Sequence, residues 1–292
     1  MWNKHSGIVL LSAGLIALAG CQKEEGIIPV AQGQYTLTLE ATKGIDTKAL
    51  SENNNVITAS WQNTEKVAVF KNGTHLGDLS VDPQSDPKVA KLSGYVNSAN
   101  GIESGDRLTL IYPARNDHKW TYTGQGGTLA GVSSNYDYAV ADITVQSIDN
   151  TGTIVTDPLA SFSNEQSIYR FKFNNGKLAV AYFIISAFKE KLVTNRTYNT
   201  SAKVWESEYG NVTVTNSNQK VSYVSLRNDN TGAEDTYYFT VVGSDNKVYF
   251  GNKTIGTAHL GNGKFVEPAV TVNQASVSKS SGAPETDSTH IW

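Results

Sequence analysis

The chain of 292 residues contains a single cysteine, Cys21, so it lacks the intramolecular disulfides that stabilise many small secreted domains. Methionine occurs only at the initiator position, and charged residues make up 17% of the chain against 39% hydrophobic residues. The net charge is −3 and there is no basic stripe, which excludes a nucleic-acid binder, because such proteins need lysines and arginines to neutralise phosphates. The fold must therefore be stabilised by the burial of apolar side chains.

Residue patterns that carry catalysis or bind metals are also missing. The five histidines are scattered, and none lies at metal-ligand spacing from another histidine or an acidic residue. There is neither a G-x-S-x-G elbow nor a Walker A loop, and Gly124-Gln125-Gly126-Gly127 lacks the lysine of a phosphate loop, so we interpret it as a turn. The acidic pair Glu234-Asp235 is predicted to be solvated, with a glycosidase pair left as the alternative. We expect no catalytic residue, no metal and no cofactor.

The N-terminus has the features of a lipoprotein signal. A basic start is followed by an apolar run from Gly7 to Ala19, whose roughly a dozen residues fit a signal peptide, whereas a membrane-spanning helix needs about twenty. Leu18-Ala19-Gly20-Cys21 resembles a bacterial lipobox, in which the cysteine is acylated and becomes the new N-terminus. We predict a signal peptide over residues 1–20 and lipidation of Cys21. An ordinary signal peptide with a chance cysteine is the alternative.

Cys21 is followed by Gln-Lys-Glu-Glu. This stretch is similar to the signal that sends lipoproteins to the outer face of the outer membrane in Bacteroidetes. An acidic, solvated linker would have the same composition.

Period-two alternation of apolar and polar residues predicts an all-β fold. The stretch from Tyr35 to Ala41 predicts a first strand with Tyr35, Leu37 and Leu39 on one face. Trp120 and Tyr122 fall in a Gly-rich stretch that predicts a surface hairpin or long loop, where packing is favoured over stacking on a sugar. Further strands are predicted at 56–61, 66–71, 75–81, 88–96, 107–113, 167–173, 178–188, 211–215, 221–226, 236–242, 247–250 and 264–272, and a short helix or strand at 137–145.

Strands at this spacing, with turn sequences between them, favour two tandem β-sandwich domains of the transthyretin-like or Greek-key type. We place the boundary near residue 158, so that the N-terminal domain covers 49–158 and the C-terminal domain covers 159–272. Residues 21–48 form a lipidated leader that contains the first strand. The Ser-rich residues 273–292 are predicted to be a flexible arm, because alone they bury too little apolar surface to fold.

Several segments, taken in order, resemble one family. They are Thr47 to Ser51, Trp61 followed by Glu65 to Phe70, Leu108 to Pro113 ending in Tyr-Pro, Gly127 to Leu129 followed by Asn135 to Ala141, and Ala160 to Phe162 followed by Tyr169 to Phe173. With the lipobox ahead of them, these segments make the chain similar to the fimbrillin (FimA-like and Mfa-like) family of Bacteroidetes type V pilins. The resemblance extends over most of residues 21 to 272.

The resemblance implies a mechanism of assembly. Such pilins travel as lipoproteins, and a trypsin-like protease then removes the lipidated leader together with the first strand. A strand from a neighbouring subunit fills the resulting groove by β-augmentation. In this chain the departure of Tyr35, Leu37 and Leu39 would empty the groove. The best-studied members are cut after arginine, whereas this connection offers only Lys43 and Lys48. Cleavage is expected between Lys48 and Ala49 by a protease that accepts lysine. The alternative is that Lys48 is a solvent-facing loop lysine and the subunit is not cut and stays lipid-anchored.

The resemblance also implies a donor strand and a set of partners. Val270, Val272, Ala275 and Val277 form a weak alternating face that is a candidate donor arm, although a frayed tail is the alternative. The implied partners are other pilin subunits, the processing protease and, through the lipid, the outer membrane. The implied location is a fimbrium on the cell surface, and the implied function is structural and adhesive.

Two alternatives remain at this level. In the first, the chain is a monomeric surface lipoprotein that stays anchored at Cys21 and binds a glycan or host ligand through exposed aromatic residues. In the second, which is the less favoured, it is a secreted or surface hydrolase.

Overall fold

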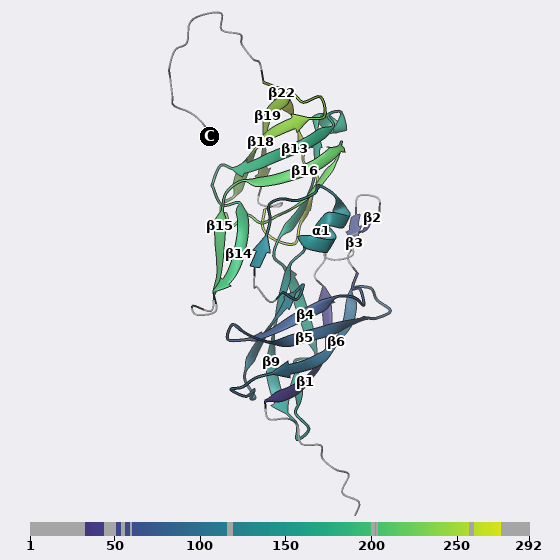
Figure 1. Cartoon of the computed structure of the whole chain (residues 1–292), viewed down its shortest axis with the longest axis vertical. Coiled ribbons are helices and arrows are strands. Elements are labelled where there is room, and N and C mark those ends of the chain that lie inside the picture. Colours follow the sequence, from purple (N-terminus) through teal and green to yellow (C-terminus); the bar gives the residue numbers. More distant parts are fainter. Residues whose placement is uncertain are drawn as a thin grey trace, which may run out of the picture.

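A computed structural model describes residues 33–43, 51–53, 56–58, 60–115, 119–199, 202, 204–256 and 260–275. These residues form an almost entirely β structure, which confirms the predicted all-β class. Figure 1 shows the N-terminal strands in the lower part of an elongated molecule and the C-terminal strands in the upper part. The single α-helix among the described residues is α1 (Leu129–Asn135). Its N-cap is Thr128, whose hydroxyl accepts a hydrogen bond from the Gly131 amide.

The lower part consists of one eight-stranded sheet. Its order is β10-β1-β11-β9-β7-β4-β5-β6, and β1 also pairs with β6. The ladder therefore closes on itself through β1. Where a β-sandwich has two separate sheets, this part of the chain has one continuous, closed sheet. The strands are β1 (Gln34–Lys43), β4 (Lys66–Lys71), β5 (Thr74–Pro83), β6 (Val89–Asn97), β7 (Arg107–Tyr112), β9 (Ala139–Ile148), β10 (Thr153–Thr156) and β11 (Leu159–Asn164).

Local sequence explains several of these elements. Alternating apolar residues in β1, β6 and β9 point inward and form the N-terminal hydrophobic core. The hairpin between β4 and β5 turns at Asn72 and Gly73, which both have positive φ, as a type I′ turn requires. The stretch 137–145, for which helix and strand were both open, lies mainly in β9. Residues 51–53 and 56–58 form a separate small hairpin, β2 (Ser51–Asn53) and β3 (Val56–Thr58).

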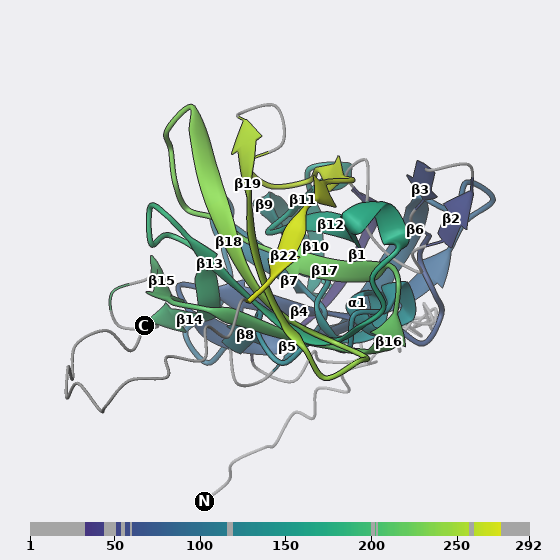
Figure 2. The ribbon, with the colours of Figure 1, turned by 90° about the horizontal axis from the view of Figure 1, so that it is seen from above.

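The upper part contains two sheets that face a second core. Figure 2 shows β13, β18 and β19 side by side, with β22 along β19. The five-stranded sheet has the order β16-β13-β18-β19-β22, and β12 carries β17, β20 and β21 in the other sheet. The strands are β12 (Ser167–Phe173), β13 (Val180–Ala187), β16 (Val212–Gln219), β17 (Ser222–Leu226), β18 (Glu234–Gly243), β19 (Val248–Gly256), β20 (Phe265–Val266), β21 (Ala269–Val270) and β22 (Val272–Gln274).

The change from the first core to the second falls later than the predicted boundary near residue 158. Strand β11 (Leu159–Asn164) pairs with β1 and β9 in the eight-stranded sheet. Its Phe162 lies in the N-terminal core, with its ring centroid 5.6 Å from that of Trp61. The next strand, which begins at Ser167, belongs to the second core. The chain therefore changes sheets between Asn164 and Ser167, because the alternating apolar residues of β11 complete the first core.

A three-stranded sheet joins the two parts. It contains β8 (Lys119–Thr121), β14 (Val193–Asn199) and β15 (Val204–Tyr209) in the order β15-β14-β8. Trp120 on β8 stacks between Tyr138 and Trp205, at centroid distances of 5.0 and 4.2 Å. Burial raises the pKa of the Tyr138 hydroxyl to about 12. The segment predicted as a surface hairpin or long loop therefore packs against the C-terminal part.

Candidate functional site in the N-terminal sheet

The candidate site is strand β1 and the groove that it occupies. On one side β1 pairs antiparallel with β6 over nine registered pairs, from Gln34 opposite Asn97 to Thr42 opposite Val89. On the other side it runs parallel to β10 and then to β11. No other described strand bridges these neighbours, so β1 alone closes the ladder. Its removal would leave two unpaired strand edges with a trough between them.

The side chains of β1 alternate as the sequence predicts. Leu37 is fully buried and Leu39 is 6% exposed, and both lie in the N-terminal core. Tyr35 is partly buried on the same face, and its hydroxyl accepts a hydrogen bond of 3.2 Å from the Ile102 amide. Ala41 continues this inward row. The three residues predicted to fill the groove therefore lie together and point into the core, while their displacement stays a prediction.

The inward row ends in a buried lysine that the sequence reasoning missed. The Lys43 side chain is 1% exposed, and its Nζ lies 3.2 Å from Oε2 of Glu65. The same Nζ lies 3.7 Å from the ring centroid of Trp61 and 4.7 Å from that of Tyr112. We call Glu65, Trp61 and Tyr112 the ammonium pocket. A carboxylate and two aromatic faces are the groups that stabilise a desolvated cation.

The walls of the ammonium pocket are held by groups outside β1. The Trp61 indole N–H donates a hydrogen bond of 3.1 Å to the Lys88 carbonyl oxygen, and the Trp61 amide donates one of 2.8 Å to Pro87. The rings of Trp61 and Tyr112 meet edge to face at 5.6 Å. Tyr112 is the last residue of β7, which pairs with β9. The pocket is therefore built from Tyr112 of the sheet that receives β1 and from Trp61 and Glu65 in the segment just before β4.

The burial of Lys43 affects which of the two lysines, Lys43 at the end of the first strand or Lys48 after it, a protease can reach. A side chain that is 1% exposed and ion-paired cannot enter the specificity pocket of a trypsin-like protease while the sheet is intact. Lys48 and Ala49 lie outside the described residues, as does the lipidation site Cys21. The expected cleavage after Lys48 and the expected acylation of Cys21 both stay predictions.

Two residues of the predicted donor arm lie in the C-terminal core of their own chain. Val270 in β21 and Val272 in β22 are 1% and 3% exposed, because both lie in the C-terminal core. They pair with β12 and β19, so they belong to the fold of their own chain. Ala275 is the last described residue, and its amide donates a hydrogen bond of 2.9 Å to Val248. Val277 lies outside the described residues.

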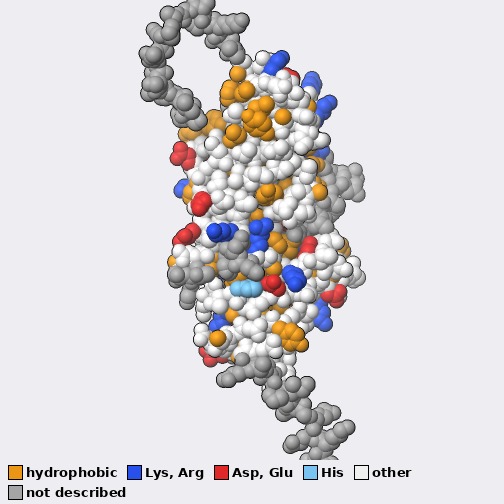
Figure 3. Space-filling view, viewed as in Figure 1, with side chains coloured by type: hydrophobic (Ala, Val, Ile, Leu, Met, Phe, Trp, Pro, Cys, Tyr) orange, Lys and Arg blue, Asp and Glu red, His pale blue; other side chains and the backbone are white. Residues whose placement is uncertain are grey.

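The aromatic residues considered for sugar stacking are buried. Trp120 is 1% exposed and Tyr122 is fully buried, so the packing interpretation holds and neither ring faces solvent. Exposed hydrophobic side chains gather instead on the C-terminal part (Figure 3). Tyr182, Tyr238 and Phe250, which are 42%, 43% and 52% exposed, project from β13, β18 and β19 on the face of the sheet that points away from the core.

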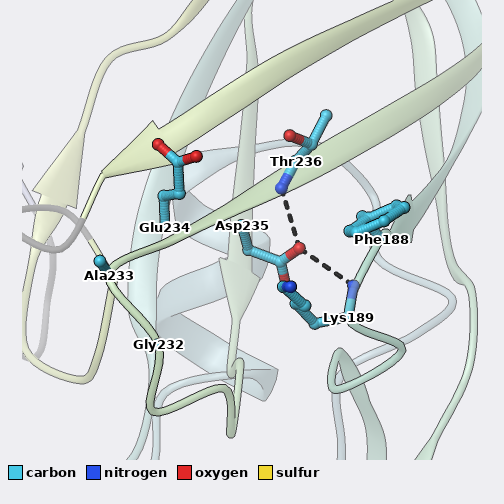
Figure 4. A pocket seen from close by; sticks show the side chains of 7 residues that line it. All are labelled: Phe188, Lys189, Gly232, Ala233, Glu234, Asp235 and Thr236. Carbon is cyan, nitrogen blue, oxygen red and sulfur yellow. Dashed lines mark hydrogen bonds between the residues drawn. The ribbon is translucent and has the colours of Figure 1, made fainter.

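The acidic pair in the C-terminal part does not form a catalytic dyad. Glu234 is exposed, whereas Asp235 is 1% exposed, which contradicts the prediction that both are solvated. In the shallow pocket of Figure 4, Oδ1 of Asp235 accepts hydrogen bonds from the amides of Lys189 (3.1 Å) and Thr236 (2.8 Å). Its Oδ2 accepts one of 2.8 Å from the Asn228 amide group. Asp235 therefore holds the start of β18 in place.

Within the described residues, no cluster of three or more His, Cys, Asp or Glu side chains could hold a metal ion. In the same part of the chain, no helix is both long enough and apolar enough to cross a membrane.

Comparisons with known proteins give only distant similarities. No protein-family model matches the chain, and no curated protein matches it. The chain is similar to the structure of a candidate cell adhesion protein from Bacteroides ovatus, with 13% identity, a TM-score of 0.43, and coverage of 82% of this chain and 95% of that one.

Two further similarities are to proteins of Porphyromonas gingivalis. The tip fimbrial protein Mfa3 has 9% identity and a TM-score of 0.35, and the match covers 78% of this chain and 84% of Mfa3. The fimbrial anchor protein Mfa2 has 11% identity and a TM-score of 0.35, and the match covers 70% of this chain and 78% of Mfa2. With TM-scores of at most 0.43, these similarities carry no argument about function.

Proposed function

We propose that the chain is a structural subunit of a fimbrium that is exported as a lipoprotein and assembles on the cell surface by strand exchange. The observation that supports this most directly is the position of β1. It lies just after the lipobox leader in sequence, and it alone closes the eight-stranded ladder among the described strands. Its loss would expose two strand edges and a trough lined by apolar side chains, and that surface is suited to β-augmentation by another subunit.

In this proposal the lipid on Cys21 delivers the subunit to the outer membrane, and β1 keeps the groove filled until a protease acts. A trypsin-like protease cuts between Lys48 and Ala49, since Lys43 is buried in its ion pair. The leader then departs with Tyr35, Leu37 and Leu39. The donor is the C-terminal arm of another pilin subunit, taken from Ala275 onward because Val270 and Val272 are core residues. The partners are other subunits, the protease and the membrane.

The test is to identify the N-terminus of surface-assembled material by mass spectrometry, together with Lys48→Gln and a control variant, Lys66→Gln, at an exposed position of β4. We expect assembled material to begin at Ala49, Lys48→Gln to abolish SDS-resistant ladders, and Lys66→Gln to retain them. Assembled material that carries only acylated Cys21 would contradict the proposal.

A second candidate function is a monomeric surface lipoprotein that binds a glycan. The exposed rings of Tyr182, Tyr238 and Phe250 favour it, because aromatic faces on a sheet can stack on sugars. A glycan array probed with the wild-type chain and with Tyr238→Ala tests it. Binding that is lost in Tyr238→Ala, without ladders in either sample, would support this candidate over the first.

A further inference from the structure

The ammonium pocket lies at the C-terminal end of β1, at one end of the groove that this strand occupies. Its two rings and its carboxylate belong to residues outside β1, and Trp61 is fixed by hydrogen bonds to Pro87 and Lys88. When β1 departs, Lys43 leaves with it, and these walls remain at one end of the groove. Glu65 then loses the Lys43 ammonium, although its side chain is only 11% exposed. An incoming strand that supplies a cation at this position regains the ion pair and the two ring contacts.

The pocket sets a pattern for the incoming strand. At the C-terminal end of β1 the inward residues run Leu39, Ala41, Lys43, so this end of the groove accepts two apolar side chains and then a cation, at alternate positions. An apolar or acidic side chain at the last position would leave the Glu65 carboxylate in the low-dielectric interior without the ammonium it faces there. The groove is therefore selective for a strand with this order of side chains.

The same order occurs at the C-terminus of this chain. After Gln274 the sequence reads Ala275-Ser276-Val277-Ser278-Lys279, with apolar residues and a lysine at alternate positions. Lys279 is the only lysine or arginine in residues 276–292, so the arm offers one cation to such a pocket. We propose that the ammonium pocket of Glu65, Trp61 and Tyr112 binds the Lys279 ammonium of a second copy of this chain and so sets the register of strand exchange.

In this arrangement Val277 takes the place of Ala41, Ala275 takes the place of Leu39, and the donor runs in the same direction as β1. The Ala275 amide gives up its hydrogen bond to Val248. Residues 270–274 stay in β21 and β22 of their own chain, so the donor covers this end of the groove and not the Tyr35 and Leu37 positions. The inference rests on the proposed function, because it requires the leader to be removed first. It adds the identity of the residue that recognises the groove, the chemistry of the pocket and the register of the donor.

The experiment compares full-length chains, without the signal peptide, after limited trypsin treatment removes the leader. Only samples whose intact mass shows a start at Ala49 and an uncut C-terminus are compared, because Lys279 is itself a trypsin site. SDS-resistant ladders are quantified for the wild type, for Lys279→Met, and for Lys220→Met as a matched control at an exposed lysine after β16. Because a charge-assisted hydrogen bond and ring contacts are lost, Lys279→Met is expected to lower ladder yield about tenfold. Lys220→Met is expected to match the wild type.

The same comparison in a Glu65→Gln background localises the effect. If Lys279 acts through the pocket, Lys279→Met lowers the yield much less there than in the wild type, since the two changes remove the same interaction. An equal loss in both backgrounds would mean that Lys279 acts elsewhere, and equal ladders from the wild type and Lys279→Met would also overturn the inference. Both results leave the proposed function standing. A wild-type chain that forms no ladder after leader removal would overturn the proposed function, and this inference with it.

Discussion

Replacement of Lys43 by methionine tests the energetic role of the ammonium pocket in the intact chain. Methionine keeps the unbranched apolar stem of lysine but removes the ammonium that lies 3.2 Å from Glu65. The partner carboxylate then stays largely buried without this cation. The change is expected to destabilise the N-terminal sheet, and the cost is set by the burial of both groups.

The magnitude follows from that burial. Loss of one partner of a buried ion pair costs about 3–5 kcal/mol, and desolvated cation–π contacts contribute up to about 2 kcal/mol. Because Glu65 retains 11% exposure, water screens its charge in part, which places the expected cost at the lower end, about 3 kcal/mol. The double variant Lys43→Met/Glu65→Met removes both charges, so it is expected to recover about half of this loss.

The assay is urea unfolding followed by tryptophan fluorescence, since Trp61 lies in the pocket. Lys66→Met, at an exposed position of β4, is the control and is expected to change the free energy of unfolding by less than about 0.5 kcal/mol. If Lys43→Met and Lys66→Met unfold at the same urea concentration, the pocket does not stabilise β1. If the double variant is less stable than Lys43→Met, the account of Glu65 as a carboxylate that needs a cation is wrong.

Three further predictions concern β1, β22 and the aromatic cluster. Leu37→Ala is expected to lower the free energy of unfolding by about 3 kcal/mol because Leu37 is fully buried, and a urea midpoint equal to that of Thr38→Ala, at an exposed site, would refute this. Gly251→Ala would drive its Cβ into the backbone beside β22, so hydrogen exchange of the β22 amides should accelerate, whereas Gly256→Ala, in open space, should leave it unchanged. Burial raises the pKa of Tyr138 to about 12, above its value of about 10 in the unfolded chain. The neutral Tyr138 hydroxyl therefore makes its full contribution to the free energy of unfolding below about pH 10, and this contribution is lost as the pH rises toward 12. Tyr138→Phe should therefore lose less stability than the wild type between those pH values in urea titrations, and parallel losses would contradict the assignment.

Much of the fold could be predicted because its strands follow a simple period-two pattern. The first strand and the Asn72-Gly73 turn are both where local sequence places them. What local sequence could not supply was which strands pair. Strand β11 reads as the start of something new after Pro158, but its partners are β1 and β9. Such long-range pairing depends on how whole layers of side chains fit together.

The inward-facing residues of the candidate site could be predicted from the period-two pattern of the first strand, but only if that pattern is continued to the last residue of the strand. Extending the period-two pattern of the first strand past Ala41 puts Lys43 on the inward face, but a charged residue is normally read as the end of a buried row. The groups that make its burial favourable, Glu65 and Tyr112, are far away in sequence, and only the fold brings them together. The same limit explains why Asp235, in polar sequence, was not predicted to be buried.

The parallel pairing of β1 with β11 has a consequence for the order in which the chain folds. Glu40 meets Leu159 across 119 positions of sequence (159 − 40), whereas Leu39 meets Leu92 across 53 (92 − 39). Contacts at such separation cost more chain entropy, and they cannot form during synthesis until the later segment has emerged. We therefore expect the junction between β1 and β11 to close last. The contact that completes the N-terminal sheet in folding is then one of those that would have to open for assembly.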